Sequence, residues 1–269
     1  MGAGTGAGAW ALWRRLKEIY AYRELLANLV AKELRSRYKG SVLGFFWTFF
    51  NPLLMLVVYT VLFSYVMRAG IEKYAMFLFV ALLPWNYLAN SVLQGAACLV
   101  QNSSLIKKVY FPREVLPLSV VLTNMVNYLL SLFILIPALL IFKVRLTAAL
   151  AAFPAVLLAQ TLLVASLALL VSAANVYFRD LEHITGVLLT VWFFLSPVLY
   201  PVDMVPEGAR KFFVLNPATP IVEAYRDIFF KGTWPDWGGL AGVAGACAVL
   251  LAVCWWVFDR LQRGVAEEI

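Results

Sequence analysis

Charged residues are scarce in this 269-residue chain, and long stretches contain none. Asp, Glu, Lys and Arg make up 14% of the sequence, whereas ordinary soluble domains carry about a quarter. Five uncharged, apolar runs are each long enough to cross a bilayer, which takes about 20 residues of helix. They cover residues 41–67, 74–106, 115–142, 146–178 and 237–258, and a shorter sixth run covers residues 184–202. The sequence therefore predicts a membrane protein with no room for a large soluble domain.

The residues that usually carry metal or acid–base chemistry are also few. The single histidine, His183, lies beside Glu182 with no second histidine or cysteine near it. Cys98, Cys247 and Cys254 lie within apolar runs and lack the spacing of metal ligands or of a disulfide framework. There is no phosphate-binding loop of the form G-x-x-x-x-G-K-[ST], so ATP hydrolysis by this chain is not expected. We therefore predict that the chain is not an enzyme and binds no metal or cofactor itself.

The lysines and arginines that are present are distributed unevenly. The net charge is +7, a property that nucleic-acid-binding proteins share. If six spans follow a cytoplasmic N-terminus, however, 14 Lys and Arg residues fall in inside segments and 8 in outside segments. This bias is typical of a membrane protein with both termini in the cytoplasm, so no nucleic-acid partner is needed to explain the charge.

The apolar runs predict an all-α integral membrane protein in which an amphipathic helix precedes six spans. In residues 10–40, apolar side chains recur every three to four positions and basic side chains fill the opposite side, as in helices that lie in the membrane interface. This helix is either a simple membrane anchor or the frame of a cytoplasmic opening. The expected divisions are a flexible Gly/Ala-rich tail at 1–9, the interfacial helix at 10–40, spans near 45–67, 75–100, 115–142, 147–174, 183–200 and 238–258, and a cytoplasmic tail at 259–269.

The connection between the second and third spans, residues 103–113, is too short and too polar to cross a membrane. Its candidate contact residues are Ser103, Ser104, Ile106, Lys107, Lys108, Tyr110, Phe111 and Arg113. Either serine is a candidate N-cap for a short helix. Such a helix presents Ile106, Tyr110 and Phe111 to the groove of a partner protein, or it rests its aromatic side chains in the interfacial belt. The sequence leaves both interpretations open.

Prolines break the region after the fifth span. Five of the 12 prolines lie between residues 196 and 220, so no continuous helix fits there. Irregular backbone at membrane depth survives only when it is buried in protein or lines a wet cavity. We expect two short re-entrant or interfacial helices in residues 201–232, near 206–214 and 220–230. The alternative is an outer loop that carries two surface helices.

The polar side chains within the spans are few and neutral. They are mostly amides: Asn86, Asn90, Gln94, Asn124, Asn127 and Gln160. The lack of intramembrane charge argues against an ion-driven transporter. Aromatic rings, at 15% of residues, and neutral amides together suit sugars, whose CH faces stack on rings and whose hydroxyls need hydrogen-bond partners. The candidates for the lining of such a pathway are Tyr59, Trp85, Asn86, Phe193 and Tyr200, and for each of them helix packing or lipid contact is the alternative.

Three segments of the sequence resemble the membrane subunits of ABC-2 type exporters. The first is ELRSRYKGSVLG at residues 33–44, followed by Phe46-Trp47 and Asn51-Pro52-Leu53-Leu54. The second, LIKKVYFPREVLP at residues 105–117, is similar to the coupling segment of the polysaccharide-exporting branch. The third runs from SPVLYP at 196–201 through MVP at 204–206 and LNP at 215–217 to EAYR at 223–226, and it resembles the outer re-entrant region of that branch. The likeness extends over about residues 22–258.

The resemblance implies the permease of an ATP-driven exporter that moves lipid-linked polysaccharide (O-antigen, capsule or teichoic acid) out of the cytoplasm. It implies a transmembrane domain at 41–258 in the cell (inner) membrane, among membrane lipids, with the pathway between two copies of this chain. Two ATP-binding cassette subunits, which carry the ATP and Mg, would dock on residues 103–113. The helix at 10–40 would flank the cytoplasmic mouth, near Arg35, Arg37 and Tyr38. The alternatives are a membrane enzyme or assembly factor acting on lipid-linked sugars, or an ABC-2 exporter of another substrate, such as a drug or a lipid.

Overall fold

The computed structural model describes residues 17–36, 44–62, 73–208, 213 and 215–262. Within these ranges the chain forms helices joined by turns and contains no strand, which confirms the all-α prediction. Both expected tails fall wholly or mostly outside the described residues, at 1–9 and beyond 262.

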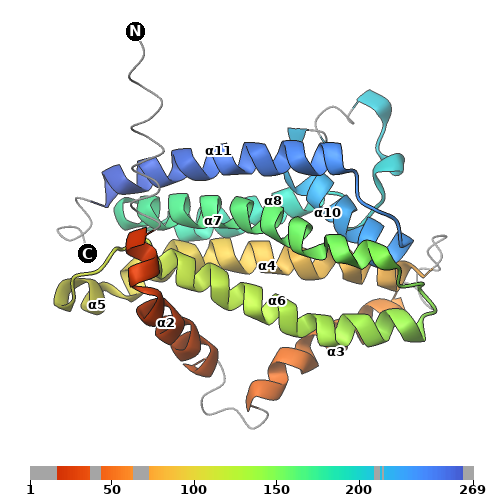
Figure 1. The fold of residues 1–269 in the computed structure, drawn as a ribbon, viewed down its shortest axis with the longest axis horizontal. Coiled ribbons are helices and arrows are strands. Elements are labelled where there is room, and N and C mark those ends of the chain that lie inside the picture. Colours follow the sequence, from red (N-terminus) through yellow and green to blue (C-terminus); the bar gives the residue numbers. More distant parts are fainter. Residues whose placement is uncertain (1–16, 37–43, 63–72, 209–212, 214, 263–269) are drawn as a thin grey trace.

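Four helices are long and apolar enough to cross a membrane, and Figure 1 shows them running side by side. They are α4 (Tyr74–Gln101), α6 (Val115–Ile141), α7 (Phe153–Tyr177), which follows the 3-10 turn η3 (Ala148–Ala152), and α11 (Trp237–Leu261). Helix α4 packs between α6 and α7, and α7 packs in turn against α11. Because α4 is buried along most of its length, it forms the centre of the bundle.

The connections between these helices alternate between the two ends of the bundle. At one end, the Tyr177 hydroxyl donates to the backbone oxygen of Leu261 at 2.6 Å, so α7 and α11 finish together. At the other end, the Thr147 hydroxyl donates to the backbone oxygen of Gly232 at 2.8 Å, so the segments that lead into α7 and α11 also meet. In Figure 1 the short helix α5 (Ser103–Lys108) lies at the first end, and α10 (Ala218–Arg226) lies toward the second.

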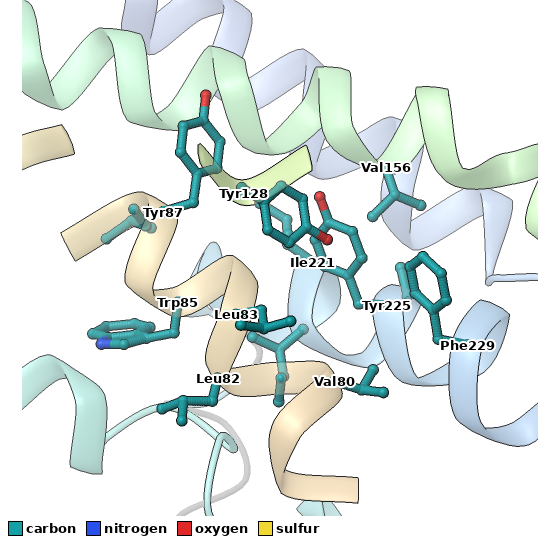
Figure 2. Close-up of a cluster of buried hydrophobic side chains, with 14 of the residues drawn as sticks. Val80, Leu82, Leu83, Trp85, Tyr87, Tyr128, Val156, Ile221, Tyr225 and Phe229 are labelled. Carbon is teal, nitrogen blue, oxygen red and sulfur yellow. The ribbon is translucent and has the colours of Figure 1, made fainter. Parts of the chain in front are cut away.

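Close packing at the centre depends on small residues and on one amide. A Cβ atom placed on Gly95 of α4 would lie 3.1 Å from the Cβ of Ala168 in α7, so the glycine lets these two helices approach closely. The Gln160 side chain of α7 donates to the backbone oxygen of Pro84 at 2.7 Å and accepts from the Tyr225 hydroxyl at 2.6 Å. One side chain therefore ties α7 to both α4 and α10 at the level of the aromatic cluster in Figure 2.

Two further apolar helices are only 14 residues long: α3 (Trp47–Thr60) and α8 (Leu181–Phe194). Part of the first predicted span, beyond residue 62, lies outside the described residues. The fifth predicted span, 183–200, is shorter than expected as a helix, because residues 195–200 form turns. Pro197 has no N–H to continue the helical hydrogen bonds, and in the turn the Asn216 amide donates to the backbone oxygen of Leu195 at 3.1 Å. Six spans therefore remain a prediction.

Helix α2 (Arg23–Ser36) is amphipathic, as predicted, but it is not one continuous helix with the residues before it. Residues 17–21 are helical, and a turn at Tyr22 separates them from α2. Leu25, Leu26 and Leu29 pack partly buried against the core near α6, whereas Asn28 is exposed on the opposite side. The expected apolar face therefore covers protein over at least part of its length, and its place in the membrane interface stays a prediction.

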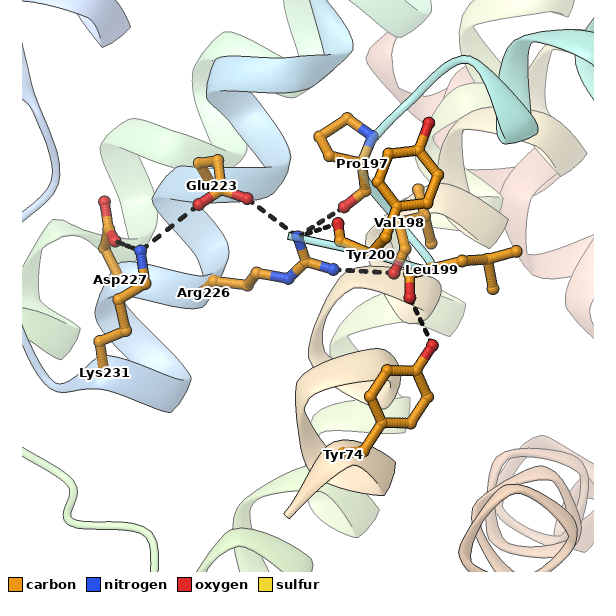
Figure 3. Close-up of polar contacts among 9 residues, drawn as sticks. All are labelled: Tyr74, Pro197, Val198, Leu199, Tyr200, Glu223, Arg226, Asp227 and Lys231. Carbon is orange, nitrogen blue, oxygen red and sulfur yellow. Dashed lines mark hydrogen bonds and ion pairs between the residues drawn. The ribbon is translucent and has the colours of Figure 1, made fainter. Parts of the chain in front are cut away.

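The second of the two expected short helices forms as α10 and the π-helical η5 (Asp227–Lys231). It is anchored by Arg226, whose side chain is fully buried (Figure 3). The guanidinium donates to the backbone oxygens of Pro197, of Val198 at 2.8 Å and of Tyr200 at 3.4 Å. It also pairs with Glu223 at 2.9 Å and lies 3.6 Å from the centre of the Phe77 ring. Arg226 is one of the 8 residues counted as outside charges in the sequence, and in the structure its buried side chain holds the turn after α8. The other expected helix, near 206–214, falls largely outside the described residues.

Replacement of Arg226 by methionine should markedly destabilise the protein. The change Arg226→Met keeps most of the length of the side chain but leaves the carbonyls of the 197–200 turn without donors. Removing one partner of a buried ionic network costs about 3–5 kcal/mol, so the melting temperature of the purified protein in detergent should fall by several degrees. Lys231→Met is the control, because that lysine is 47% exposed and its ion pair with Asp227 should contribute less than about 1 kcal/mol. Equal melting temperatures for the two variants would contradict the anchoring role.

Candidate functional site

The connection between α4 and α6 forms an exposed projection at one end of the bundle. Helix α5 begins after Asn102, which is its N-cap in place of either serine, and the chain is extended from Val109. Arg113 then donates to the backbone oxygen of Gln262, so the end of α11 is fastened to the base of the projection. The Gln262 amide also donates to Asp259 at 2.7 Å. The projection is thus held by the two flanking helices and by the last helix of the described chain.

The side chains of the projection point in different directions, which the sequence did not reveal. Lys107, Lys108 and Tyr110 are exposed, Tyr110 to 91%. Phe111 is only 5% exposed, because it packs into the chain's own core with Leu99 and Leu116. The interpretation of Phe111 as an exposed anchor is therefore wrong for this structure, and Tyr110 is the available aromatic side chain.

The same projection encloses a hollow of 360 Å³. It is lined by Ile106, Lys107, Lys108, Val109, Tyr110, Phe111 and Arg113. Ser103 and Ser104 lie in the first turn of α5, outside this lining. The hollow combines two exposed ammonium groups with an exposed ring, so it can accept a partner surface that offers acidic and apolar groups.

Only one of the three residues predicted at the cytoplasmic mouth can be placed. Arg35 is exposed in the last turn of α2, and Arg37 and Tyr38 lie outside the described residues.

Three of the five predicted lining residues meet at one cavity between α4 and α8. Trp85, Asn86 and Phe193 line a space of 300 Å³, together with Asn90 and Thr190. The centres of the Trp85 and Phe193 rings are 5.5 Å apart. Trp85 is buried, with only 6% of its surface exposed. Trp85 is therefore both a packing residue and part of the cavity wall.

Tyr59 and Tyr200 do not belong to this cavity. Tyr59 is half-buried in α3 and packs against the main core. Tyr200 lies in the turn after α8, where its hydroxyl donates to the backbone oxygen of Phe194 at 2.6 Å. Both fit the packing alternative in this structure.

A second, larger cavity of 420 Å³ lies between α3, α4 and α6. Its polar lining residues are Thr48, Asn51, Asn86, Tyr87, Asn90, Asn124, Asn127, Tyr128 and Ser131. The sequence had marked four of the amides but missed Asn51, Tyr87 and Tyr128. The spacing of Asn86, Asn90 and Gln94, every four positions, indicates one polar helix face, but it does not point to Asn51, Tyr87 or Tyr128.

Both cavities are electrically neutral. No Asp, Glu, Lys, Arg or His is among the described residues that line either of them. Among the described residues there is also no cluster of His, Cys, Asp and Glu that would hold a metal ion. The arrangement can bind neutral, hydroxyl-bearing molecules, and it offers no counter-charge to an ion.

Comparison with known proteins agrees with this geometry. Residues 24–230 match the ABC-2 type transporter family. The O-antigen export system permease protein RfbA of Myxococcus xanthus is 42% identical over 258 residues, which are 95% of this chain and 99% of that protein. Two proteins of the same description from Klebsiella pneumoniae are each 32% identical, over 91% of this chain and 94% of their own. Because the match extends across most of the chain, this protein belongs to the ABC-2 type transporter family.

Proposed function

We propose that this chain is the permease subunit of an ATP-driven exporter that moves a lipid-linked polysaccharide of the O-antigen type from the cytoplasm across the cell (inner) membrane. The observation that carries the proposal is the end-to-end similarity to an O-antigen export permease, at 42% identity over 95% of the chain. The neutral cavities within apolar helices support it, because a glycan needs hydrogen-bond partners and ring faces but no counter-ions.

Deletion of the gene tests the substrate. We expect cells that still make the glycan with normal composition but display little of it, while lipid-linked glycan accumulates inside. Antibody binding to intact cells measures the displayed glycan, and mass spectrometry of membrane extracts measures the accumulated form.

The same experiment separates the alternatives. A glycan of altered composition would favour an enzyme or assembly factor. Normal display would contradict glycan export and favour another exported substrate, such as a drug or a lipid.

The energy for export comes, in this proposal, from two ATP-binding cassette subunits that dock on residues 103–113. The chain itself has no phosphate-binding loop. The exposed ring of Tyr110, flanked by Lys107 and Lys108, is suited to a partner's groove, because aromatic side chains are common anchors of protein interfaces.

Tyr110→Ala should weaken binding of the ATP-binding subunit. A buried aromatic anchor commonly contributes about 2 kcal/mol, which corresponds to roughly a 30-fold loss of affinity. Co-purification at graded subunit concentrations measures the loss, and export should fall with it. Met204→Ala, at a residue 64% exposed and distant from the projection, is the control. Phe111→Ala should instead lower the stability of the permease, since that ring is buried. Normal binding by Tyr110→Ala would contradict the docking role.

We further propose six spans, both termini in the cytoplasm and a pathway between two copies of this chain. The end of α11 is fastened beside the docking projection by Arg113 and Gln262, which supports a cytoplasmic C-terminus. Helices α3 and α8 supply the first and fifth spans, and α10 with η5 forms the outer re-entrant element. Trp85, Asn86 and Phe193 line the pathway.

Single-cysteine labelling tests the orientation. The permease is expressed alone, with Cys98, Cys247 and Cys254 replaced, and carries either Tyr110→Cys or Met204→Cys. A membrane-impermeant maleimide should label position 204 in spheroplasts, and position 110 only after the membrane is opened. The reverse pattern would overturn the orientation.

A further inference from the structure

The cavity between α3, α4 and α6 has the size and the position of a binding site within the bundle. Its 420 Å³ falls in the range of small-ligand sites, about 300–1,000 Å³. Tyr87 lies at the midpoint of the 28-residue α4, and Asn127 and Tyr128 lie at the midpoint of the 27-residue α6. The site therefore lies midway along α4 and α6, and the first turns of α3, with Trp47 and Asn51, complete its wall.

The side chain of Asn127 marks the unsatisfied part of this cavity. Its amide nitrogen and amide oxygen are both buried, and neither has a hydrogen-bond partner within the described residues. The amide nitrogen of its neighbour Asn124 is satisfied, because it donates to Gln94 and to the backbone oxygen of Val120, each at 3.1 Å. A buried, unpaired amide is destabilising. A guest that both donates and accepts hydrogen bonds would remove that penalty after a rotation of the side chain.

The other residues that line this cavity indicate which class of ligand it would bind. The rings of Tyr87 and Tyr128 are stacked, with centres 5.9 Å apart and planes within 6° of each other (Figure 2). Trp47 adds a third aromatic side chain to the wall, and Asn51 and Asn90 add two more amides. Rings beside neutral amides match a pyranose or furanose unit, which has apolar CH faces and hydroxyls that donate and accept. An ionised group would be left without a counter-charge.

We propose that this cavity is a subsite for one or two neutral sugar units of the exported glycan, with Asn127 and Asn90 binding their hydroxyls. The proposal rests on the proposed export of a glycan. The proposed subsite is the amide-lined cavity formed by α3, α4 and α6 of one chain. It adjoins the cavity between α4 and α8, because Asn86 and Asn90 line both.

Substitution of Asn127 separates binding from stability. Asn127→Leu has a similar volume and removes the unpaired amide, so the melting temperature should stay the same or rise. Oligosaccharide affinity should nevertheless fall about tenfold, the loss expected from one or two hydrogen bonds, and export in cells should decrease. A purely structural role of Asn127 would not give higher stability with weaker binding.

The binding probe is a set of oligosaccharides released by mild acid from the cell's own surface glycan. They are titrated into the purified permease–ATPase complex, in a detergent whose headgroup contains no sugar, and followed by saturation-transfer NMR. Phe133→Leu, on the outer side of α6 at a residue 69% exposed, is the matched control and should bind normally. Asn90→Leu, at an exposed residue, gives a second variant should Asn127→Leu fail to fold.

The outcomes distinguish this subsite from the proposed function. Normal binding by both Asn→Leu variants overturns the subsite and leaves glycan export intact. Competition by a polyprenyl phosphate without sugar also overturns it, because the site would then hold the lipid carrier. A gene deletion that leaves the surface glycan unchanged overturns the export function and the subsite with it.

Discussion

The buried guanidinium of Arg226 stabilises the irregular turn that follows α8. Helix α8 ends at Phe194, and the proline-rich turn that follows exposes backbone oxygens that no helix can satisfy. Three of these oxygens, at residues 197, 198 and 200, accept hydrogen bonds from Arg226. In a bilayer such groups have no water to bind, so only protein donors stabilise a break in a helix. The cation is offset in turn by Glu223 and by the face of Phe77. One arginine thus joins α10, α4 and the end of α8.

Away from that anchor, the fold is held by close packing and by a few neutral hydrogen bonds. Gly95 lets α4 approach α7, and Gln160 links α7 to α4 and α10. These contacts leave α4 enclosed, whereas large apolar side chains such as Phe133 of α6 and Leu188 of α8 remain on the outside. An exposed apolar surface of this kind is suited to lipid or to a second chain. The bundle is therefore closely packed at its centre and exposes apolar side chains at its periphery, as expected of a subunit that works in a membrane.

The sequence was a good guide to the elements and a poor guide to the directions of side chains. Uncharged runs predicted the four long helices, because length and hydropathy alone identify a span. The proline cluster predicted a broken region, although not that α8 would stop at Phe194, where Asn216 from a later segment donates to the first turn residue, Leu195. Phe111 was assigned to the surface beside Tyr110, yet it is buried. In helices that are apolar all round, periodicity does not show which residue faces the protein. Only the folded structure shows which way each side chain points, and it shows Tyr59 and Tyr200 packed against the protein and not in the cavity between α4 and α8.

The amide-lined cavity follows from the same physical constraint as the Arg226 anchor. Polar groups within apolar helices must be satisfied, and Arg226 does this for the backbone oxygens of residues 197, 198 and 200. Neither amide atom of Asn127 has such a partner within the described residues, although the amide nitrogen of Asn124 on the same helix makes two hydrogen bonds. Within the described residues, Ser91, Thr219, Arg226 and Trp255 also carry a buried atom without a hydrogen-bond partner, but none of these four lines the cavity between α3, α4 and α6. Asn127 lies beside stacked tyrosines, in a cavity whose described lining residues carry no charge. Unpaired hydrogen-bonding capacity next to aromatic faces is what a sugar requires of a binding site, which is the reason for proposing a sugar subsite here.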